Sequence, residues 1–202
     1  MANPVIDGYA ADAVEIIPRY EALPTETVLG AVLHLIPTSP CRVLDVGAGT
    51  GRNPAWFAAQ GHRVTACEPV DAFRLNAVDQ YRKSNIRWLD DTLPGLAATK
   101  SVGEFYDFIL LSGVWHHVSP QERAPSMASL AHLMAPGAGL IISVRHGRSA
   151  PNRPSYDPSD EEVERLAIAA GLEQTFLKQT EAIQAANRAA GVTWTWFAFS
   201  RP

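Results

Sequence analysis

Residues 43–51 read VLDVGAGTG, an apolar strand that runs directly into three glycines at alternate positions. Glycine adopts backbone torsions that other residues avoid, and it allows a ligand to approach the main chain closely. A buried strand that ends in such a loop is typical of an open α/β sheet, in which ligands bind beyond the carboxyl ends of the strands. This segment therefore constrains both the fold and the position of a site.

Strand-like and helix-like segments alternate along the rest of the chain. We expect strands at residues 42–46, 63–68, 86–89, 106–112, 139–144, 174–178 and 192–200. We expect helices at residues 10–22, 26–36, 53–60, 70–82, 120–134, 160–170 and 181–190. This alternation, with near-continuous apolar runs such as FILL, predicts a mostly parallel sheet covered by helices on both faces. The aromatic last strand follows only a short helical stretch, which favours an antiparallel closing strand.

Composition limits the classes of protein that fit. The chain has 202 residues, 47% of them hydrophobic, which predicts one domain. The formal net charge is −4 and the basic residues are scattered, so we expect no nucleic-acid partner. Cys41 and Cys67 are expected at opposite ends of neighbouring strands, too far apart for a disulfide. The N-terminus does not resemble a signal peptide and no apolar run could span a bilayer, so we expect a cytoplasmic protein without a membrane or metal partner.

Two carboxylates narrow the expected ligand. Glu68 follows the second strand, where a carboxylate can accept hydrogen bonds from both hydroxyls of a ribose. A ribose-binding carboxylate at this position fits both dinucleotides and S-adenosylmethionine. However, the glycines are spaced Gly-x-Gly-x-Gly rather than Gly-x-Gly-x-x-Gly, and Asp45 lies two residues before them. A carboxylate there would repel a pyrophosphate but not a sulfonium or an amino group, so the local charge favours a cationic cofactor.

Five features in order give the chain a specific resemblance. The run VLDVGAGTGRNPAWFAAQGHRVTACEP is followed by Asp90-Asp91, a strand from Tyr106-Asp107 to Ser112-Gly113, the histidine pair at 116–117 and the turn LMAPGAG at 133–139. Together they resemble class I S-adenosylmethionine-dependent methyltransferases over about residues 40–145. The resemblance implies a Rossmann-like, doubly wound seven-stranded sheet in a single domain. Residues 1–38 would form a helical lid, 40–145 the cofactor-binding core, and 146–202 the substrate side.

The resemblance also implies contacts to S-adenosylmethionine, whose product is S-adenosylhomocysteine. The implied cofactor-binding residues are Asp45, Gly47, Ala48, Gly49, Gly51, Glu68, Pro69, Leu89, Asp90, Asp91, Ser112, Gly113, Trp115, Tyr9 and Arg19. The glycine loop would wrap the methionine part and the ribose, and Glu68 would bind the ribose hydroxyls. Either Asp90 or Asp91 would meet the adenine amino group. Arg19, in the lid, would pair with the cofactor's carboxylate.

Further implied contacts concern the ends of the cofactor. Asp45 would brace the loop and face the amino group through water, and Leu89 with Asp90 would offer backbone groups to adenine. Ser112 and Gly113 would line the methionine end, and Trp115 would cover it.

The sequence indicates the residues of the acceptor half of such a site less clearly. His116 or His117 is the candidate general base for a hydroxyl or thiol acceptor, although one of them could simply begin the next helix. A neutral amine would need no base. The positions after the fourth strand read SGVW rather than the Asn-Pro-Pro-Tyr run of base and glutamine methylation, so a small-molecule acceptor is expected.

Other polar and aromatic residues near this half have less definite expected roles. Arg145 could serve the substrate or hold a loop. The tryptophans and phenylalanines outside the motifs are expected in the core; they are Trp56, Trp88, Trp194, Trp196, Phe197 and Phe199.

Three functions fit the sequence. The first is a methyltransferase for a small molecule, acting by in-line transfer. The second is an S-adenosylmethionine-binding protein without methyl transfer, for example a regulatory or partner subunit. The third is a nicotinamide-dependent oxidoreductase. For the first function, the N-terminal helices and a mobile loop at residues 146–158 are expected to close the pocket.

Overall fold

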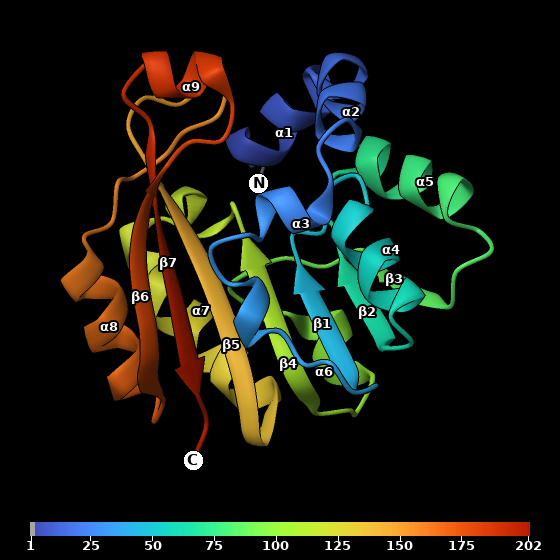
Figure 1. Ribbon diagram of the computed structural model, residues 1–202, viewed down its shortest axis with the longest axis vertical. Helices are drawn as coiled ribbons and strands as arrows, with labels where there is room; N and C mark the ends of the chain where they lie inside the picture. Colours follow the sequence, from blue (N-terminus) through green and yellow to red (C-terminus); the bar gives the residue numbers. More distant parts are fainter. Residues whose placement is uncertain (1–2) are drawn as a thin grey trace.

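A seven-stranded sheet in the order β3-β2-β1-β4-β5-β7-β6 forms the centre of the computed structural model, which describes residues 3–202 (Figure 1). The strands are β1 (Arg42–Val46), β2 (Arg63–Cys67), β3 (Ile86–Leu89), β4 (Tyr106–Ser112), β5 (Met134–His146), β6 (Glu173–Glu181) and β7 (Thr193–Ser200). The strands from β3 to β5 pair in parallel, and β7 is antiparallel to both β5 and β6. The predicted fold class, with its antiparallel last strand, is confirmed.

Helices connect the strands and cover both faces of the sheet (Figure 1). They are α1 (Pro4–Ala11), α2 (Ala13–Glu21), α3 (Thr25–Val28), α4 (Arg52–Ala59), α5 (Asp71–Gln80), α6 (Ala97–Ser101), α7 (Pro120–Leu133), α8 (Asp160–Ala169) and α9 (Ala185–Ala189), with short 3-10 turns at η1 (Leu33–Leu35) and η2 (Trp115–His117). Successive strand residues point to opposite faces. Accordingly, Leu44 and Ile109 belong to one buried cluster, whereas Val43 and Phe108 belong to a second cluster across the sheet.

The N-terminal helices differ from the sequence prediction. The helix expected at 10–22 is two helices that break at Asp12, and the first begins earlier because the Asn3 side chain caps it by accepting from the Val5 and Ile6 amides. The helix expected at 26–36 is wrong beyond its first turn. Gly30 lowers the helix propensity there, and the chain continues in turns to η1.

Three smaller differences concern segments around the later strands. The stretch expected to be a loop around Pro94 contains α6. β5 begins at Met134 rather than at 139, and β6 extends over Glu173–Glu181. The two cysteines are free, as expected. Among residues 3–202, no helix is both long and apolar enough to cross a membrane.

The carboxyl ends of β1, β2 and β4 meet at one edge of the sheet, at the top of Figure 1. The helices α1, α2, α3 and α9 lie over this edge, although they come from opposite ends of the chain (Figure 1). This is the position at which open α/β sheets bind ligands.

Candidate functional site

A cavity of about 650 Å³ lies over the carboxyl ends of the parallel strands. Its walls come from the glycine loop after β1, the ends of β2, β4 and β5, the N-terminal helices, and the segment that carries Arg153. Residues before and after α9 and the start of β7 close the remaining side. The cavity therefore joins the lid, the core and the C-terminal segment in one site.

The glycine loop is held against β2 by its own backbone. The Gly47 and Ala48 amides both donate to the Cys67 carbonyl at 2.9 Å. Gly47 and Gly49 line the cavity and have positive φ angles of 74° and 57°. Gly51, with φ 89°, lies behind the loop, where a Cβ atom would come within 2.8 Å of Trp88. Ala48 and Gly51 thus shape the loop without lining the cavity.

Glu68 supports this loop and also lines the cavity. Its Oε2 accepts from the Gly49 amide at 2.6 Å, and its Oε1 accepts from the Val70 amide at 2.8 Å. Only 4% of the residue is exposed, and burial raises the pKa of its carboxyl to about 7 despite these two hydrogen bonds. Each carboxylate oxygen has two lone pairs, so the group can still accept hydrogen bonds from a ligand.

Asp45 is buried beneath the loop, outside the cavity lining, with one carboxylate oxygen, Oδ2, unpartnered among the described residues. Burial raises the pKa of its carboxyl to about 7, and the nearby charge of Arg52 opposes that shift. A buried, unpartnered carboxylate oxygen is costly unless a cation or a donor compensates it. This environment fits an amino group or a sulfonium and does not fit a pyrophosphate.

The two aspartates after β3 have different surroundings. Asp91 lines the cavity, and its Oδ2 accepts from the amide and the hydroxyl of Thr99 at 2.8 and 2.7 Å. The Asp90 side chain is 68% exposed, lies 3.5 Å from Arg74, and is outside the cavity lining. Leu89 also lies outside the lining, and its carbonyl accepts from the Glu68 amide. The structure therefore brings Asp91, and not Asp90, to the cavity.

The end of β4 supplies Ser112 and Gly113 to the lining, and the Gly113 amide donates to Ser143 Oγ at 2.8 Å. Trp115 does not join them. Its side chain is fully buried in the core beneath η2, where its Nε1 has no partner in the part of the chain described. The expectation that Trp115 covers the methionine end is therefore not met, because the 3-10 turn directs the ring into the core.

Tyr9, Arg19 and Pro69 line the cavity, as the sequence predicted. Arg52 lines it as well, which the sequence analysis missed. Its Nη1 donates to the Tyr20 carbonyl at 2.8 Å, and burial lowers the pKa of its guanidinium. Its role could have been inferred from the sequence, because Arg52 directly follows the third glycine and starts α4.

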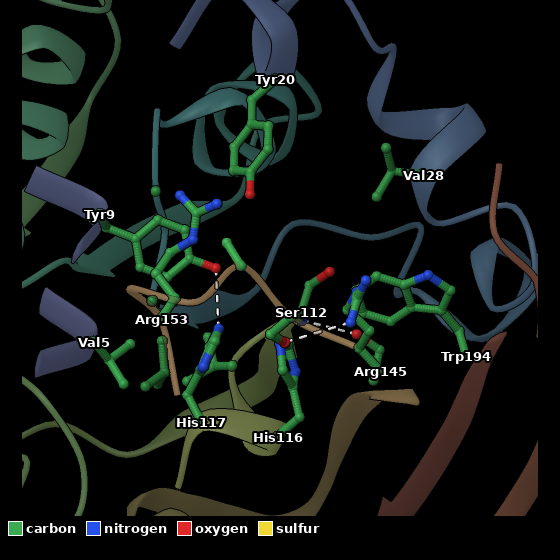
Figure 2. A pocket seen from close by; sticks show the side chains of 18 of the residues that line it. Val5, Tyr9, Tyr20, Val28, Ser112, His116, His117, Arg145, Arg153 and Trp194 are labelled. Atoms are coloured by element: carbon green, nitrogen blue, oxygen red, sulfur yellow. Dashed lines mark hydrogen bonds between the residues drawn. The ribbon is translucent and has the colours of Figure 1, made fainter. Parts of the chain in front are cut away.

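His117 has a defined tautomer. Its Nδ1 lies 2.6 Å from the Pro154 carbonyl, which can only accept, so Nδ1 carries the proton. Its Nε2 is therefore the acceptor for the Tyr9 hydroxyl at 3.0 Å (Figure 2). Burial lowers the pKa of His117 and raises that of Tyr9, so at neutral pH the imidazole is an uncharged base and the phenol keeps its proton.

His116 lies beside His117 and also lines the cavity, with ring centroids 4.0 Å apart. It is 3% exposed, its Nδ1 has no partner among residues 3–202, and burial lowers its pKa well below the ordinary value. His117 is therefore the better placed base of the two. The described chain holds no cluster of three His, Cys, Asp or Glu residues arranged to bind a metal ion.

Trp194 corrects another expectation. It lines the cavity and is only partly buried, whereas Trp196, Phe197 and Phe199 pack in the core as expected, and Trp196 also borders the cavity. The Trp194 ring lies edge-on to His116, with centroids 6.0 Å apart. The alternation along β7 would have placed Phe197 and Phe199 on the opposite face from Trp194 and Trp196.

The other two tryptophans lie nearer the surface than expected. Trp56 is half-buried against the second core cluster and donates from Nε1 to Glu26 at 2.6 Å. Trp88, also half-buried, packs behind Gly51.

Residues 146–158 reach across the cavity to the N-terminal helices. Arg153 pairs with Asp12 at 2.8 Å, and its guanidinium lies 4.8 Å from the centre of the Tyr9 ring. Arg148 and Arg153 both line the cavity. This segment therefore covers the pocket, as the sequence predicted, and its mobility stays a prediction.

Comparisons with known proteins identify the family. Residues 21–197 match the family model described as a methyltransferase domain. An uncharacterized methyltransferase of Staphylococcus carnosus is 27% identical over 109 residues, which are 54% of this chain and 49% of that protein. The chain spans about half the length of the curated relatives it matches first.

Two solved structures share the fold over almost the whole chain. The 1,6-didemethyltoxoflavin-N1-methyltransferase of Burkholderia thailandensis, with bound S-adenosylhomocysteine, has a TM-score of 0.73 at 24% identity and covers 100% of this chain and 91% of its own. Magnesium protoporphyrin IX methyltransferase of Synechocystis has a TM-score of 0.66 at 16% identity. The match covers 97% of this chain and 81% of that enzyme. At these identities the likeness shows the fold alone.

Proposed function

The chain belongs to the methyltransferase-domain family, and from that premise we propose that it transfers the methyl group of S-adenosylmethionine to a small-molecule acceptor. The observation that carries the proposal is one continuous cavity of about 650 Å³ over the strand ends. On one side it is lined by the glycine loop and Glu68, and on the other by a histidine base and an aromatic wall. A donor and an acceptor can thus meet in one site.

The donor half has a polar group for each part of the cofactor. Glu68 would bind the ribose hydroxyls, and Asp45, buried beneath the loop, would attract the cationic amino group through its charge. Asp91 would meet the adenine amino group, in place of Asp90. Arg19 and Arg52 are the two cations available for the cofactor's carboxylate on this side.

The acceptor half would act mainly by positioning. When bound, the cofactor supplies an electrophilic methyl on a sulfonium, and the leaving thioether is neutral, so little acid catalysis is needed. Holding the nucleophile in line with that methyl can supply roughly 7–11 kcal/mol in favourable intramolecular cases. For a hydroxyl or thiol acceptor, His117 Nε2 would take the proton, since its Nδ1 is held by Pro154. The proton would pass either directly, once the acceptor displaces the Tyr9 hydroxyl from Nε2, or through that hydroxyl, which would give its own proton to Nε2 and take the acceptor's.

A small acceptor is supported by the size and enclosure of the cavity. A volume of about 650 Å³ must hold the cofactor and the acceptor together, and sites for small molecules usually measure 300–1,000 Å³. The toxoflavin and porphyrin enzymes with the same fold act on small molecules, according to their names. We assign residues 1–38 to the lid, 40–145 to the donor core and 146–202 to the acceptor side. The free thiols of Cys41 and Cys67 fit a reducing compartment such as the cytoplasm.

A methyl-transfer screen tests this proposal. The protein is incubated with S-adenosylmethionine labelled in the methyl group and with pools of small molecules, and labelled products are separated. We expect label in a small molecule from at least one pool. Tight binding of S-adenosylhomocysteine together with silence in every pool would instead support a cofactor-binding protein without methyl transfer.

A further inference from the structure

Arg145 stands near the end of β5, on the wall of the cavity and beside Trp194 (Figure 2). In the β5–β7 ladder it is directly opposite Trp194, so the guanidinium and the indole lie side by side on the same face of the sheet. Both residues line the cavity. The pair is part of the acceptor half and has no role yet in the proposed chemistry.

The charge of Arg145 is not neutralised by the protein. Among residues 3–202, no carboxylate lies within 4.0 Å of its guanidinium. Only Nη1 has protein partners, namely the Gly147 carbonyl at 3.0 Å and Ser149 Oγ at 3.4 Å. The N–H groups on Nε and Nη2 are left without an acceptor in the described chain.

Two phenols and a second cation face Arg145. Tyr9 and Tyr20 favour its charge, whereas Arg153, whose own partner is Asp12, opposes it. Partial burial lowers the pKa of Arg145, which shows that its charge has lost some of its hydration. A partly desolvated guanidinium with free N–H groups is stabilised by an anion.

The carboxylates that line the cavity lie elsewhere. Glu68 and Asp91 belong to the donor half, where backbone amides and Thr99 hold them. Glu122 accepts from Ser119, and Glu181 is exposed at the end of β6. The anion that completes the surroundings of Arg145 is therefore to be sought in the ligand.

We propose that Arg145 binds a carboxylate of the methyl acceptor, and that the substrate is a small organic acid whose planar part lies against Trp194. The planar guanidinium presents paired N–H groups that match the two oxygens of a carboxylate. This inference rests on the proposed function, and it names the substrate class of the same site.

The distances place such an acid next to the donor. A Cβ atom on Gly113 would lie 3.7 Å from the Trp194 ring, so the indole lies directly over the end of β4, where the methionine part of the donor is expected. His116 contacts the same ring edge-on. An acid anchored on Arg145 would therefore have its remaining atoms between Trp194 and the donor methyl.

The cofactor also carries a carboxylate that Arg145 could bind. The experiment therefore distinguishes binding of the cofactor's carboxylate from binding of the acceptor's carboxylate. S-adenosylhomocysteine carries that carboxylate, whereas 5′-methylthioadenosine lacks the whole amino-acid part. Both are titrated calorimetrically into the wild type, Arg145→Gln and Arg145→Lys. Arg165→Gln, which replaces an exposed arginine outside the cavity lining, is the matched control.

For the acceptor, the protein saturated with S-adenosylhomocysteine is titrated with two acids and their neutral amides: benzoate with benzamide, and indole-3-acetate with indole-3-acetamide. We expect at least one acid to bind about tenfold more tightly than its amide, the range of one charge-assisted hydrogen bond. Arg145→Gln should remove this difference, Arg145→Lys should keep part of it, and the control should keep all of it.

Three outcomes overturn the inference. The first is that neither acid binds more tightly than its amide, and the second is that the preference survives in Arg145→Gln. The third is that Arg145→Gln weakens S-adenosylhomocysteine but not 5′-methylthioadenosine, which would assign Arg145 to the donor. Absence of any S-adenosylhomocysteine binding in the wild type would instead refute the proposed function itself. Thermal unfolding of each variant confirms that it is folded.

Discussion

The Glu68 carboxylate both holds the glycine loop and faces the cavity. It accepts from the Gly49 and Val70 amides, which fixes the loop, and it faces the cavity in which a ribose would lie. A neutral amide in its place keeps one acceptor oxygen but loses the charge. We expect Glu68→Gln to weaken S-adenosylhomocysteine binding by about tenfold or more, since hydrogen bonds to charged groups are the stronger ones.

Calorimetry on Glu68→Gln measures this loss, and Glu173→Gln, at an exposed position at the start of β6, is the matched control. An affinity equal to that of the wild type would refute the ribose role of Glu68.

The buried carboxyl of Asp45 should make the affinity for S-adenosylhomocysteine depend on pH. Burial raises its pKa to about 7, so below that pH the carboxyl in the free protein is increasingly protonated and uncharged. The cationic amino group of the ligand favours the ionised form, so affinity should rise as the pH increases through about 7. Titrations with S-adenosylhomocysteine from pH 5.5 to 8.5 measure this rise. Glu68, with a similar pKa, adds to it in the same direction.

The Asp45→Asn variant cannot ionise at this position. Its affinity should be lower at high pH, and it should change less across the range than that of the wild type. Identical pH profiles for the two proteins would show that Asp45 does not attract the cation.

At the level of single residues, local patterns predicted the donor half well. Residues that directly follow a parallel strand reach the cavity, as Glu68, Ser112 and Gly113 do, because the strand fixes their position. Trp115 is only three residues past β4, but an intervening 3-10 turn directs it into the core. Arg52 and Trp194 were not predicted, because their contribution depends on which segment packs opposite them.

The loop between β1 and α4 is the element on which the donor half depends. Gly47 and Gly49 both have positive φ angles, but their surroundings differ. A Cβ on Gly47 would lie 2.3 Å from a methyl carbon of Val114, whereas one on Gly49 meets nothing within 4 Å. The two positions therefore form a matched pair for an alanine substitution.

We expect Gly49→Ala to lower the free energy of unfolding by about 1–2 kcal/mol, the cost of a left-handed backbone for a residue with a Cβ. Gly47→Ala adds a steric overlap of the kind that costs a further ~1–3 kcal/mol, so it should lose clearly more. Urea unfolding of both variants measures the difference. Equal losses, or a larger loss for Gly49→Ala, would contradict the described loop.

Most strands could be predicted because apolar runs bounded by turns are strong local signals, and β4 has the predicted bounds. The ends of β5 and β6 could not be predicted, because the lengths of these strands depend on their pairing with β7. The helix expected at residues 26–36 failed for another reason. Its apolar residues have a spacing that fits a helix, but Gly30 and tertiary contacts with the core favour turns. α6 is too short to give a periodic signal.

On the scale of the whole molecule, the cavity exists because distant segments meet over one edge of the sheet. Asp12 in the lid pairs with Arg153 in the C-terminal segment, and Tyr9 reaches His117 after β4. No local pattern in the sequence gives these contacts. The sequence therefore predicted several residues that line the cavity on the side of the glycine loop, whereas the opposite side became visible only when the lid, core and C-terminal segment were assembled.

The central claim is that this cavity binds an S-adenosyl donor. The most direct measurement is a calorimetric titration of the protein with S-adenosylhomocysteine and, separately, with NADH. We predict saturable binding of S-adenosylhomocysteine at one site and no binding of NADH, because Asp45 lies under the loop where a pyrophosphate would be placed. Binding of NADH without binding of S-adenosylhomocysteine would contradict the account.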